Sequence, residues 1–159
     1  MNSKLINKSD TYFFKISCGT YILFFSIKEE CAVTPGKLGK FVIPPGNYCY
    51  IGSALLNLQK RILRHLRKNK NRYHWHIDYL LNQKEVSIDR VWILLSRIHL
   101  ECCLNNEVLQ KLCGYSIITG FGSSDCKSRC LSHLTYLEIS TNDVIRHLNH
   151  YINGHLTEY

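Results

Sequence analysis

Hydrophobic and polar positions along the chain predict strands at its beginning. Residues 11–27 contain two apolar stretches, and the second, GTYILFFSI at 19–27, is apolar on both of its alternating faces. Such a pattern is typical of a central strand that is covered on both sides. Residues 28–40 are interrupted by Pro35-Gly36, so we expect them to form a loop or an edge excursion.

A turn is predicted at residues 44–47, Pro-Pro-Gly-Asn. Proline at the second position and glycine at the third suit a type II turn. We therefore expect the segment FVI at 41–43 to pair with NYCYI at 47–51 as a hairpin. Tyr48 and Tyr50 would share one face of the second strand, because side chains in a strand alternate with period two.

Helical periodicity appears in the rest of the chain. Asn57 is a candidate N-cap for a helix with an apolar stripe at Leu58, Ile62 and Leu66. Three more helices are expected, at 71–83, at 99–112 with Leu100, Leu104 and Val108 inward, and at about 141–153, capped by Ser140 or Thr141, with Val144, Ile145, Leu148 and Ile152 inward. Strands are expected at 91–95, 116–119 and 133–139.

These elements indicate an α+β protein, a small, mainly antiparallel sheet flanked by helices. With 159 residues, of which 45% are apolar, the chain 1–159 is expected to form a single domain with its own core. No apolar run reaches the roughly 18 residues that span a bilayer, so no membrane partner is expected. Eight cysteines without a secretory signal indicate reduced thiols in the cytoplasm or a metal site.

The formal net charge of +8 suggests an anionic partner. Basic side chains are concentrated between residues 60 and 72, in and just after the predicted basic helix. Such clustering suits the phosphate backbone of a nucleic acid. The side chains expected to contact DNA are Ser53, Lys60, Arg64, Arg67 and Lys68.

The segment 46–68 combines a strand end, a tight loop and a basic helix. Its Tyr50-Ile51-Gly52, followed by Arg61-x-x-x-His65, resembles the second half of a GIY-YIG nuclease domain, and Gly19-Thr20-Tyr21 resembles the first half. Over about residues 19–137 the chain is further similar to the Uri-type branch of that superfamily, through PPGNYCYIGSA, RHL, HWHIDYLL, LEC, GFGSSDC and SHL in that order. Residues 22–49 separate the two tyrosines, whereas most members have a short hairpin there.

The resemblance implies a metal-dependent endonuclease that hydrolyses phosphodiester bonds in single-stranded, duplex or branched DNA. Tyr21 or Tyr50 would position the attacking water, and one of the two phenols would act as general base. A free phenol has a pKa near 10, so a neighbouring cation would have to lower that pKa, and Arg61 is the natural candidate. Its guanidinium would also bind the phosphate oxygens.

The resemblance assigns the remaining roles to histidines and one carboxylate. His65 would share in proton transfer or hydrogen-bond a phosphate or Tyr21. Glu101 would hold one Mg²⁺ or Mn²⁺ ion, because hard cations prefer carboxylate oxygen. His74 or His76 corresponds to a further active-site histidine of some relatives.

The same residues allow other interpretations. The two tyrosines could simply pack the sheet, and Arg61 could be one more solvated helix charge. A non-catalytic DNA- or RNA-binding module, or a repair-accessory protein whose partner supplies the chemistry, would keep the same basic face. His74-x-His76-x-Asp78 is similar to the start of the metallo-β-lactamase signature, but Tyr79 stands where that signature has its next histidine. Asp78 is instead expected to anchor a neighbouring histidine or cap a local interaction.

A structural zinc site is a separate prediction. Cys126-x-x-x-Cys130-x-x-His133 offers three ligands, with Cys102 as the candidate fourth. Zinc prefers four nitrogen or sulfur ligands in a tetrahedron. The alternative is that these cysteines are buried and act as small hydrophobic residues.

Overall fold

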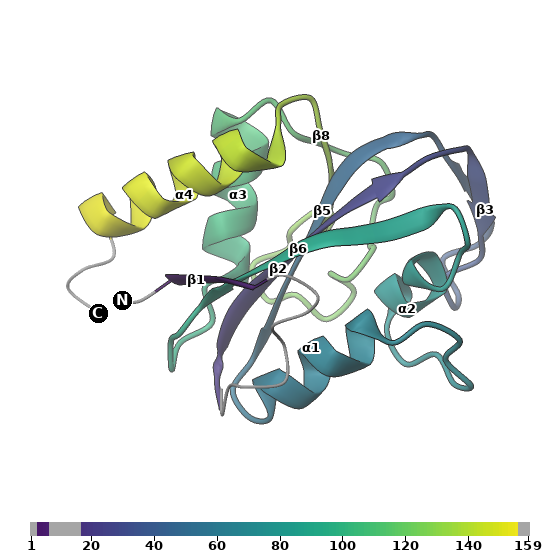
Figure 1. The fold of residues 1–159 in the computed structure, drawn as a ribbon, viewed down its shortest axis with the longest axis horizontal. Helices are drawn as coiled ribbons and strands as arrows, with labels where there is room; N and C mark the ends of the chain where they lie inside the picture. The colour runs from purple at the N-terminus through teal and green to yellow at the C-terminus, as the bar shows by residue number, and fades with distance from the viewer. Residues whose placement is uncertain (1–2, 7–16, 156–159) are drawn as a thin grey trace.

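The structure is a computed structural model that describes residues 3–6 and 17–155 (Figure 1). Its main sheet has six strands in the order β1-β6-β2-β5-β8-β7, and each neighbouring pair is antiparallel. The strands are β1 (Ser3–Ile6), β2 (Gly19–Ile27), β5 (Gly46–Ala54), β6 (Val86–Leu94), β7 (Tyr115–Ser116) and β8 (Leu134–Leu137). The predicted α+β class with a mainly antiparallel sheet is confirmed.

Helices cover both faces of the sheet. Figure 1 shows α1 (Leu58–Leu66) and α2 (His76–Leu81) on one side and α3 (Glu101–Lys111) and α4 (Thr141–His155) on the other. Two apolar cores result, because alternating residues of β2 and β5 pack against opposite helix pairs. The pair α3 and α4 is further linked by His147 Nε2 and Glu107 Oε1, which lie 2.6 Å apart. No helix in the described part of the chain is long and apolar enough to cross a bilayer.

Strand β2 is the central strand that the sequence predicted. It lies between β6 and β5, and eight of its nine residues are buried. Tyr21, Leu23 and Phe25 face α1 and α2, whereas Ile22 and Phe24 face α3 and α4. Burial on both faces explains why the segment 19–27 lacks an apolar–polar alternation.

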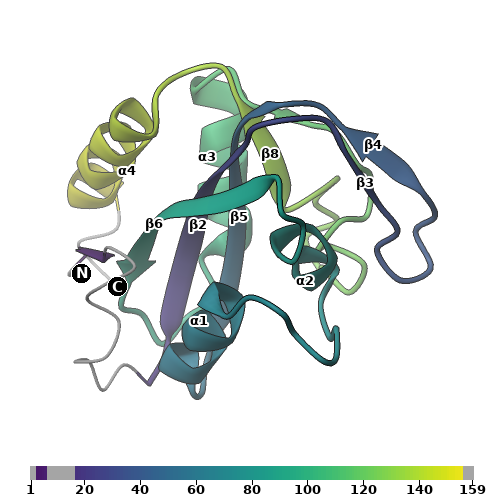
Figure 2. The same ribbon diagram turned by 45° about the vertical axis from the view of Figure 1, so that its right-hand side comes forward.

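The predicted hairpin across residues 44–47 is wrong. Strand β5 pairs with β2 along its whole length, from Gly19 opposite Ala54 to Ile27 opposite Gly46, so its partner edge is already occupied. The segment 41–43 is strand β4 (Phe41–Ile43), and it pairs with β3 (Cys31–Val33). Figure 2 shows this two-stranded ribbon continuing beyond the ends of β2 and β5. Gly46 serves packing instead of a turn, because a Cβ there would lie 2.4 Å from Cε2 of Tyr136.

The remaining elements differ from expectation mainly at their ends. The helix expected at 71–83 is only the short α2, and the strand expected at 91–95 extends back to Val86. Strand β1 was not predicted, and the first apolar stretch, 11–16, lies outside the described residues. The strand expected at 116–119 is the two-residue β7, and that expected at 133–139 is β8.

The two predicted helix caps have opposite outcomes. Ser140 caps α4, since its Oγ accepts a hydrogen bond from the backbone N–H of Asp143 at 3.2 Å. Asn57 precedes α1 but makes no side-chain capping bond, so that prediction is wrong. Its φ of 56° places it in the left-handed region, where its carbonyl accepts the N–H of Arg61 at 3.1 Å.

Candidate active site

Four of the residues predicted to act in catalysis or to bind Mg²⁺ line one pocket of about 330 Å³. Tyr21 comes from β2, Tyr50 from β5, Arg61 from α1 and Glu101 from the first turn of α3. These positions are far apart in the sequence. The antiparallel pairing of β2 with β5 and the packing of two helices on opposite faces of the sheet bring them together.

Gly52 makes room for the Tyr21 phenol. Tyr21 lies directly opposite Gly52 in the β2–β5 register, and Tyr50 lies two residues away on the same face. A Cβ at residue 52 would be 2.6 Å from the Tyr21 hydroxyl oxygen, which is closer than real contacts allow. Gly122 plays the same part for Tyr50, because a Cβ there would be 2.6 Å from Cε2 of that ring. Both phenols therefore depend on a glycine that faces them.

The Tyr21 hydroxyl is linked to Asp78 through His65. The Tyr21 oxygen lies 2.9 Å from His65 Nε2, and His65 Nδ1 lies 3.7 Å from Asp78 Oδ1. The side chains of His65 and Asp78 are 1% and 0% exposed. The other carboxylate oxygen accepts three hydrogen bonds, from Arg64 Nη2 at 2.9 Å and from the backbone N–H groups of His74 and Trp75 at 2.9 and 3.2 Å. Asp78 thus caps the turn before α2, as one of the two predicted roles requires, and it faces His65 at 3.7 Å without a hydrogen bond.

The charges of His65 and Asp78 follow from their burial and from their polar neighbours. Burial lowers the pKa of His65, and the nearby Asp78 offsets that shift only in part. Burial by itself would raise the pKa of Asp78, but the nearby His65 side chain and hydrogen bonds from the His74 backbone and from Arg64 hold it well below its usual range. At neutral pH, His65 is therefore neutral and Asp78 is ionised.

Both phenols of the pocket stay protonated at neutral pH. Burial raises the pKa of Tyr21 well above its usual range, and the neighbouring Tyr50 raises it further. Burial and then Glu101 raise the pKa of Tyr50. Arg61 acts in the opposite direction on both phenols but is outweighed. The expectation that Arg61 makes one of these phenols acidic is therefore wrong for the free protein.

The Arg61 guanidinium is held at the pocket by two contacts. Its Nη1 donates a hydrogen bond to the backbone carbonyl of Ser53 at 2.6 Å. Its central carbon lies 4.9 Å from the ring centroid of Trp75, within the range of a cation–π interaction. The remaining guanidinium donors can reach a ligand in the pocket that the side chain lines.

Glu101 is oriented by a hydroxyl that also contacts a histidine. Ser53 Oγ donates to Glu101 Oε2 at 2.7 Å and lies 2.6 Å from His99 Nδ1. A serine hydroxyl carries one proton, so His99 Nδ1–H donates to Ser53 when Ser53 donates to Glu101. Ser53 is 7% exposed. In this structure it positions the carboxylate, and a direct contact with DNA stays a prediction.

Sequence reasoning gave no site role to three polar or aromatic side chains that line the pocket, His99, Trp75 and Asp125. His99 and Asp125 lie in irregular segments, where no periodicity marks an inward side chain. Trp75 lies within the quoted segment HWHIDYLL, and an aromatic side chain that close to a basic helix was the available indication.

The two candidate histidines after α1 lie in a neighbouring hollow of about 300 Å³, with Tyr50 and Asp125. His74 is exposed, and its ring packs edge-on against Trp75 with centroids 4.4 Å apart. His76 Nδ1 accepts a hydrogen bond from the Gly122 N–H at 3.1 Å. Neither histidine lines the pocket that contains Tyr21 and Arg61.

The predicted DNA-binding side chains divide into two groups. Lys60 and Arg67 are exposed on α1 and just after it. Arg64 and Lys68 bind the protein itself: Arg64 Nη2 contacts Asp78 and the Arg72 carbonyl, and Lys68 Nζ donates to the carbonyls of residues 81, 83 and 86. A basic hollow of about 200 Å³ remains beside them, lined by Arg64, Arg67, Asn69, Lys70, Asn71 and Arg72.

The predicted zinc ligands come together. Ligand atoms of Cys102, Cys126, Cys130 and His133 all lie within 4.8 Å of one another, so this cluster could hold a metal ion such as zinc. All eight cysteines of the chain are free thiols. His133 lines the candidate pocket as well, so the cluster lies next to one of its walls.

Comparison with known proteins identifies a family but no activity. No curated protein and no solved structure matches the chain. One family model matches residues 20–154, from the second residue of β2 to the last residue but one of α4. The match therefore includes both tyrosines, the pocket and the cysteine cluster, and the chain belongs to the family described as "Domain of unknown function DUF123".

Proposed function

We propose that this protein is a metal-dependent endonuclease of the GIY-YIG type that hydrolyses phosphodiester bonds in DNA. The main support is the convergence of Tyr21, Tyr50, Arg61 and Glu101 on one pocket. Phosphodiester hydrolysis needs a positioned water, a cation on the phosphate oxygens and help for the leaving oxygen. The pocket offers a side chain for each need. The eight free thiols suit the reducing cytoplasm.

Arg61 binds the reacting phosphate in this proposal. Its contacts with the Ser53 carbonyl and with Trp75 fix the plane of the guanidinium before a ligand arrives. A planar fork of N–H donors matches two phosphate oxygens, and a fixed cation near developing charge is a large contribution to catalysis.

Tyr21 and His65 together accept a proton. A protonated phenol cannot take a proton from water unless it loses its own. Because Tyr21 Oη lies 2.9 Å from the neutral His65 Nε2, its proton can move to that nitrogen as the phenol oxygen takes one from the attacking water. The ionised Asp78 stabilises the imidazolium that results.

Glu101 suits a hard divalent cation such as Mg²⁺ or Mn²⁺. One of its carboxylate oxygens accepts a hydrogen bond from Ser53, and carboxylate oxygen is the donor that these ions prefer. Such an ion, when bound, would neutralise charge on the leaving oxygen. Ser53 and His99 are positioning residues here, because they keep the carboxylate turned towards the pocket.

A non-catalytic nucleic-acid-binding module is the second candidate. It is favoured by the burial of the two phenols, which are 2% and 5% exposed and whose pKa values are raised. In that case phosphates would bind to Lys60, Arg67 and the basic hollow beside α1. The two phenols would serve only to pack the sheet.

A cleavage assay separates the two candidates. Labelled single-stranded, duplex and branched DNA are each incubated with the full chain and Mg²⁺ or Mn²⁺. The nuclease predicts that Arg61→Ala and Glu101→Gln lose cleavage by at least about 100-fold while DNA affinity changes little. Arg146→Ala and Glu138→Gln, two exposed changes far from the pocket, are the matched controls and should cleave like the wild type.

Each outcome decides between the candidates. Binding of DNA with no product under either metal removes the nuclease and leaves the binding module. If the protein neither binds nor cleaves DNA, both candidates are removed. Cleavage that survives Arg61→Ala and Glu101→Gln removes the assignment of this pocket as the active site.

A further inference from the structure

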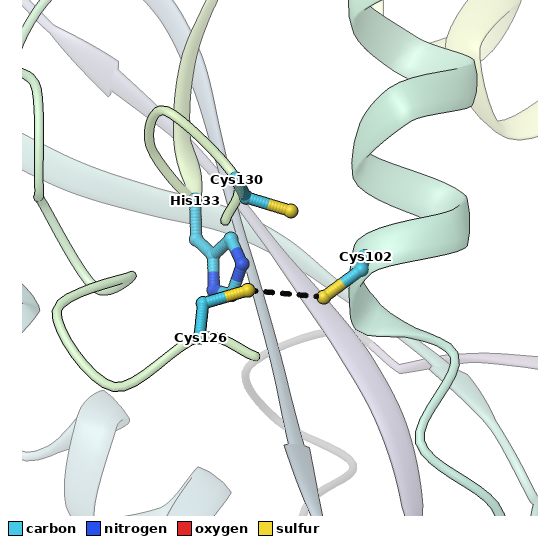
Figure 3. Close-up of side chains that lie close together, drawn as sticks. All are labelled: Cys102, Cys126, Cys130 and His133. Carbon is cyan, nitrogen blue, oxygen red and sulfur yellow. Dashed lines mark hydrogen bonds between the residues drawn. The ribbon is translucent and has the colours of Figure 1, made fainter. Parts of the chain in front are cut away.

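We propose that Cys102, Cys126, Cys130 and His133 bind one structural Zn²⁺ ion, and that this ion fixes the loop behind the pocket to the start of α3. The side chains come from distant parts of the chain: Cys102 lies in the first turn of α3, and the others lie in the irregular segment 117–133. Figure 3 shows the three sulfur atoms and the imidazole ring turned towards one another.

The distances fit a single tetrahedral ion. With Zn–S bonds of about 2.3 Å, two sulfur ligands of a tetrahedral site lie about 3.8 Å apart. The Sγ atoms of Cys102 and Cys126 are 3.3 Å apart, so an ion between them needs a shift of about half an ångström. The same distance is far above the roughly 2.05 Å of a disulfide bond. A set of ligand atoms within 4.8 Å also leaves little room for a multinuclear cluster.

The chemistry of the donors favours zinc. Three thiols and one imidazole form a Cys₃His set, which is common in structural zinc sites and leaves no open coordination position. Binding forms three Zn–S bonds and one Zn–N bond, and it releases the thiol protons to water without any change in oxidation state. No oxidant or reductant is needed.

His133 is prepared for a metal. It is 3% exposed, and its Nε2 is buried without a hydrogen-bond partner among the described residues. The Gly122 backbone lies beside the imidazole, where it can accept the other ring N–H. Metal-binding histidines usually donate their second ring N–H to such an acceptor, which fixes the tautomer. The backbone of His133 is held as well, because its carbonyl accepts the Ile51 N–H of β5 at 3.0 Å.

The cluster cysteines differ from the cysteines that only pack. Cys31 and Cys49 are 5% and 0% exposed and belong to the two apolar cores, as expected of small hydrophobic side chains. Cys102, Cys126 and Cys130 are partly exposed and belong to neither core. Their positions are therefore not explained by packing.

A bound ion would connect two walls of the pocket. Glu101 immediately precedes Cys102, and Asp125 immediately precedes Cys126; both carboxylates line the pocket. Ile118 and Phe121 attach the beginning of the loop to the apolar core. From Phe121 to the start of β8, the loop consists of turns and irregular segments. Zinc would hold these turns against α3, whether or not the pocket hydrolyses DNA.

Metal content tests the site directly. The full chain, produced with added zinc and desalted, should hold one equivalent of zinc by elemental analysis. Cys102→Ser and Cys126→Ser should each reduce that content to less than about a tenth after dialysis, since even outer-shell changes cost 10–100-fold in affinity. Cys103→Ser is the matched control: its thiol, next to Cys102 in sequence, contacts the Tyr151 hydroxyl at 3.2 Å and should be dispensable for zinc.

Cobalt substitution reports ligand type and geometry in the wild type, so it tests the site even if a variant fails to fold. Metal-stripped wild-type protein titrated with Co²⁺ should develop thiolate-to-cobalt absorption and the strong visible bands of tetrahedral cobalt, saturating at one equivalent. Zinc should then displace the cobalt. Absence of metal in the wild type, a full equivalent of zinc in Cys102→Ser, octahedral cobalt spectra, an iron–sulfur absorption before titration, or a Cys102–Cys126 disulfide by mass spectrometry would each overturn the proposal.

Hydrogen exchange tests the structural role. Removing zinc with a chelator should increase amide exchange by at least about tenfold in residues 117–133 and in the first turn of α3, while β2 and α4 keep their protection. Equal exchange with and without zinc would show that the ion does not hold the loop.

Discussion

Replacing Asp78 by asparagine is the most demanding test of the buried network beneath the pocket. The substitution keeps the shape of the side chain and removes its charge. Asp78 Oδ2 accepts from Arg64 and from two backbone N–H groups, and Oδ1 lies 4.0 Å from the Lys70 ammonium, which is 2% exposed. An asparagine carbonyl can keep the backbone bonds, but its amide turns towards His65 and Lys70, which also carry donors.

The expected loss of stability is about 3 kcal/mol. Removing one partner from a buried ion pair typically costs 3–5 kcal/mol. The lower end applies here because Arg64 is 33% exposed and can recover contact with solvent. For a chain of this length, about 3 kcal/mol corresponds to a fall in Tm of roughly 6–12 °C. The urea midpoint should fall by about 1.5 M.

Urea unfolding at several pH values checks both the size and the origin of the effect. The pKa of Asp78 is depressed in the folded state, so its stabilisation is fully present above the unfolded pKa of about 3.9. It is lost as the pH falls through the lower folded pKa. The difference in free energy of unfolding between wild type and Asp78→Asn should therefore narrow from about pH 5 towards pH 2.

A surface carboxylate provides the control. Asp89 is exposed on β6, so Asp89→Asn should stay within about 0.5 kcal/mol of the wild type. If Asp78→Asn also loses less than about 1 kcal/mol, or if its deficit is as large near pH 2 as at pH 7, the ionised carboxylate does not stabilise this network as argued.

Three further predictions concern other parts of the fold. Gly52→Ala should cost about 1–3 kcal/mol in urea unfolding, because the new methyl group meets the Tyr21 hydroxyl, whereas Gly154→Ala, with open space around it, should not destabilise. Ser140→Ala should cost about 1 kcal/mol by removing the cap of α4, a loss that unchanged thermal melting would contradict. If the basic surface binds DNA, Arg67→Ala should reduce the log–log salt slope of affinity by about 1, and an unchanged slope would place the phosphates elsewhere.

The core could be predicted from sequence because its patterns are long and unambiguous. The segment 19–27 is apolar on both faces, so it is stable only as a strand that is covered on both sides. The apolar stripe from Val144 to Ile152 defines a single inward face of α4. The ribbon could not be predicted in the same way. Pro-Pro-Gly-Asn suits a turn, and only the long pairing of β5 with β2 shows that this turn is not used.

The candidate site was predictable where a motif carries it and not elsewhere. Tyr50, Arg61 and Glu101 were named from short motifs, and they line one pocket. The contacts of Ser53 with His99 and Glu101 join residues from a strand end, a loop and a helix start, and no local pattern encodes such a meeting. The raised pKa values of the phenols also depend on burial by distant segments.

The length of the β3–β4 ribbon can change without altering the register of the strands that carry the site residues. Its strands pair with each other through Cys31 opposite Ile43, while the site-bearing strands are locked independently from Gly19 to Ile27. Adding or deleting one residue in each arm would change how far its tip extends beside His76 and Gly120, yet Tyr21 would stay opposite Gly52. Related chains could thus lengthen or shorten this arm to accommodate differently shaped ligands without disturbing the tyrosines.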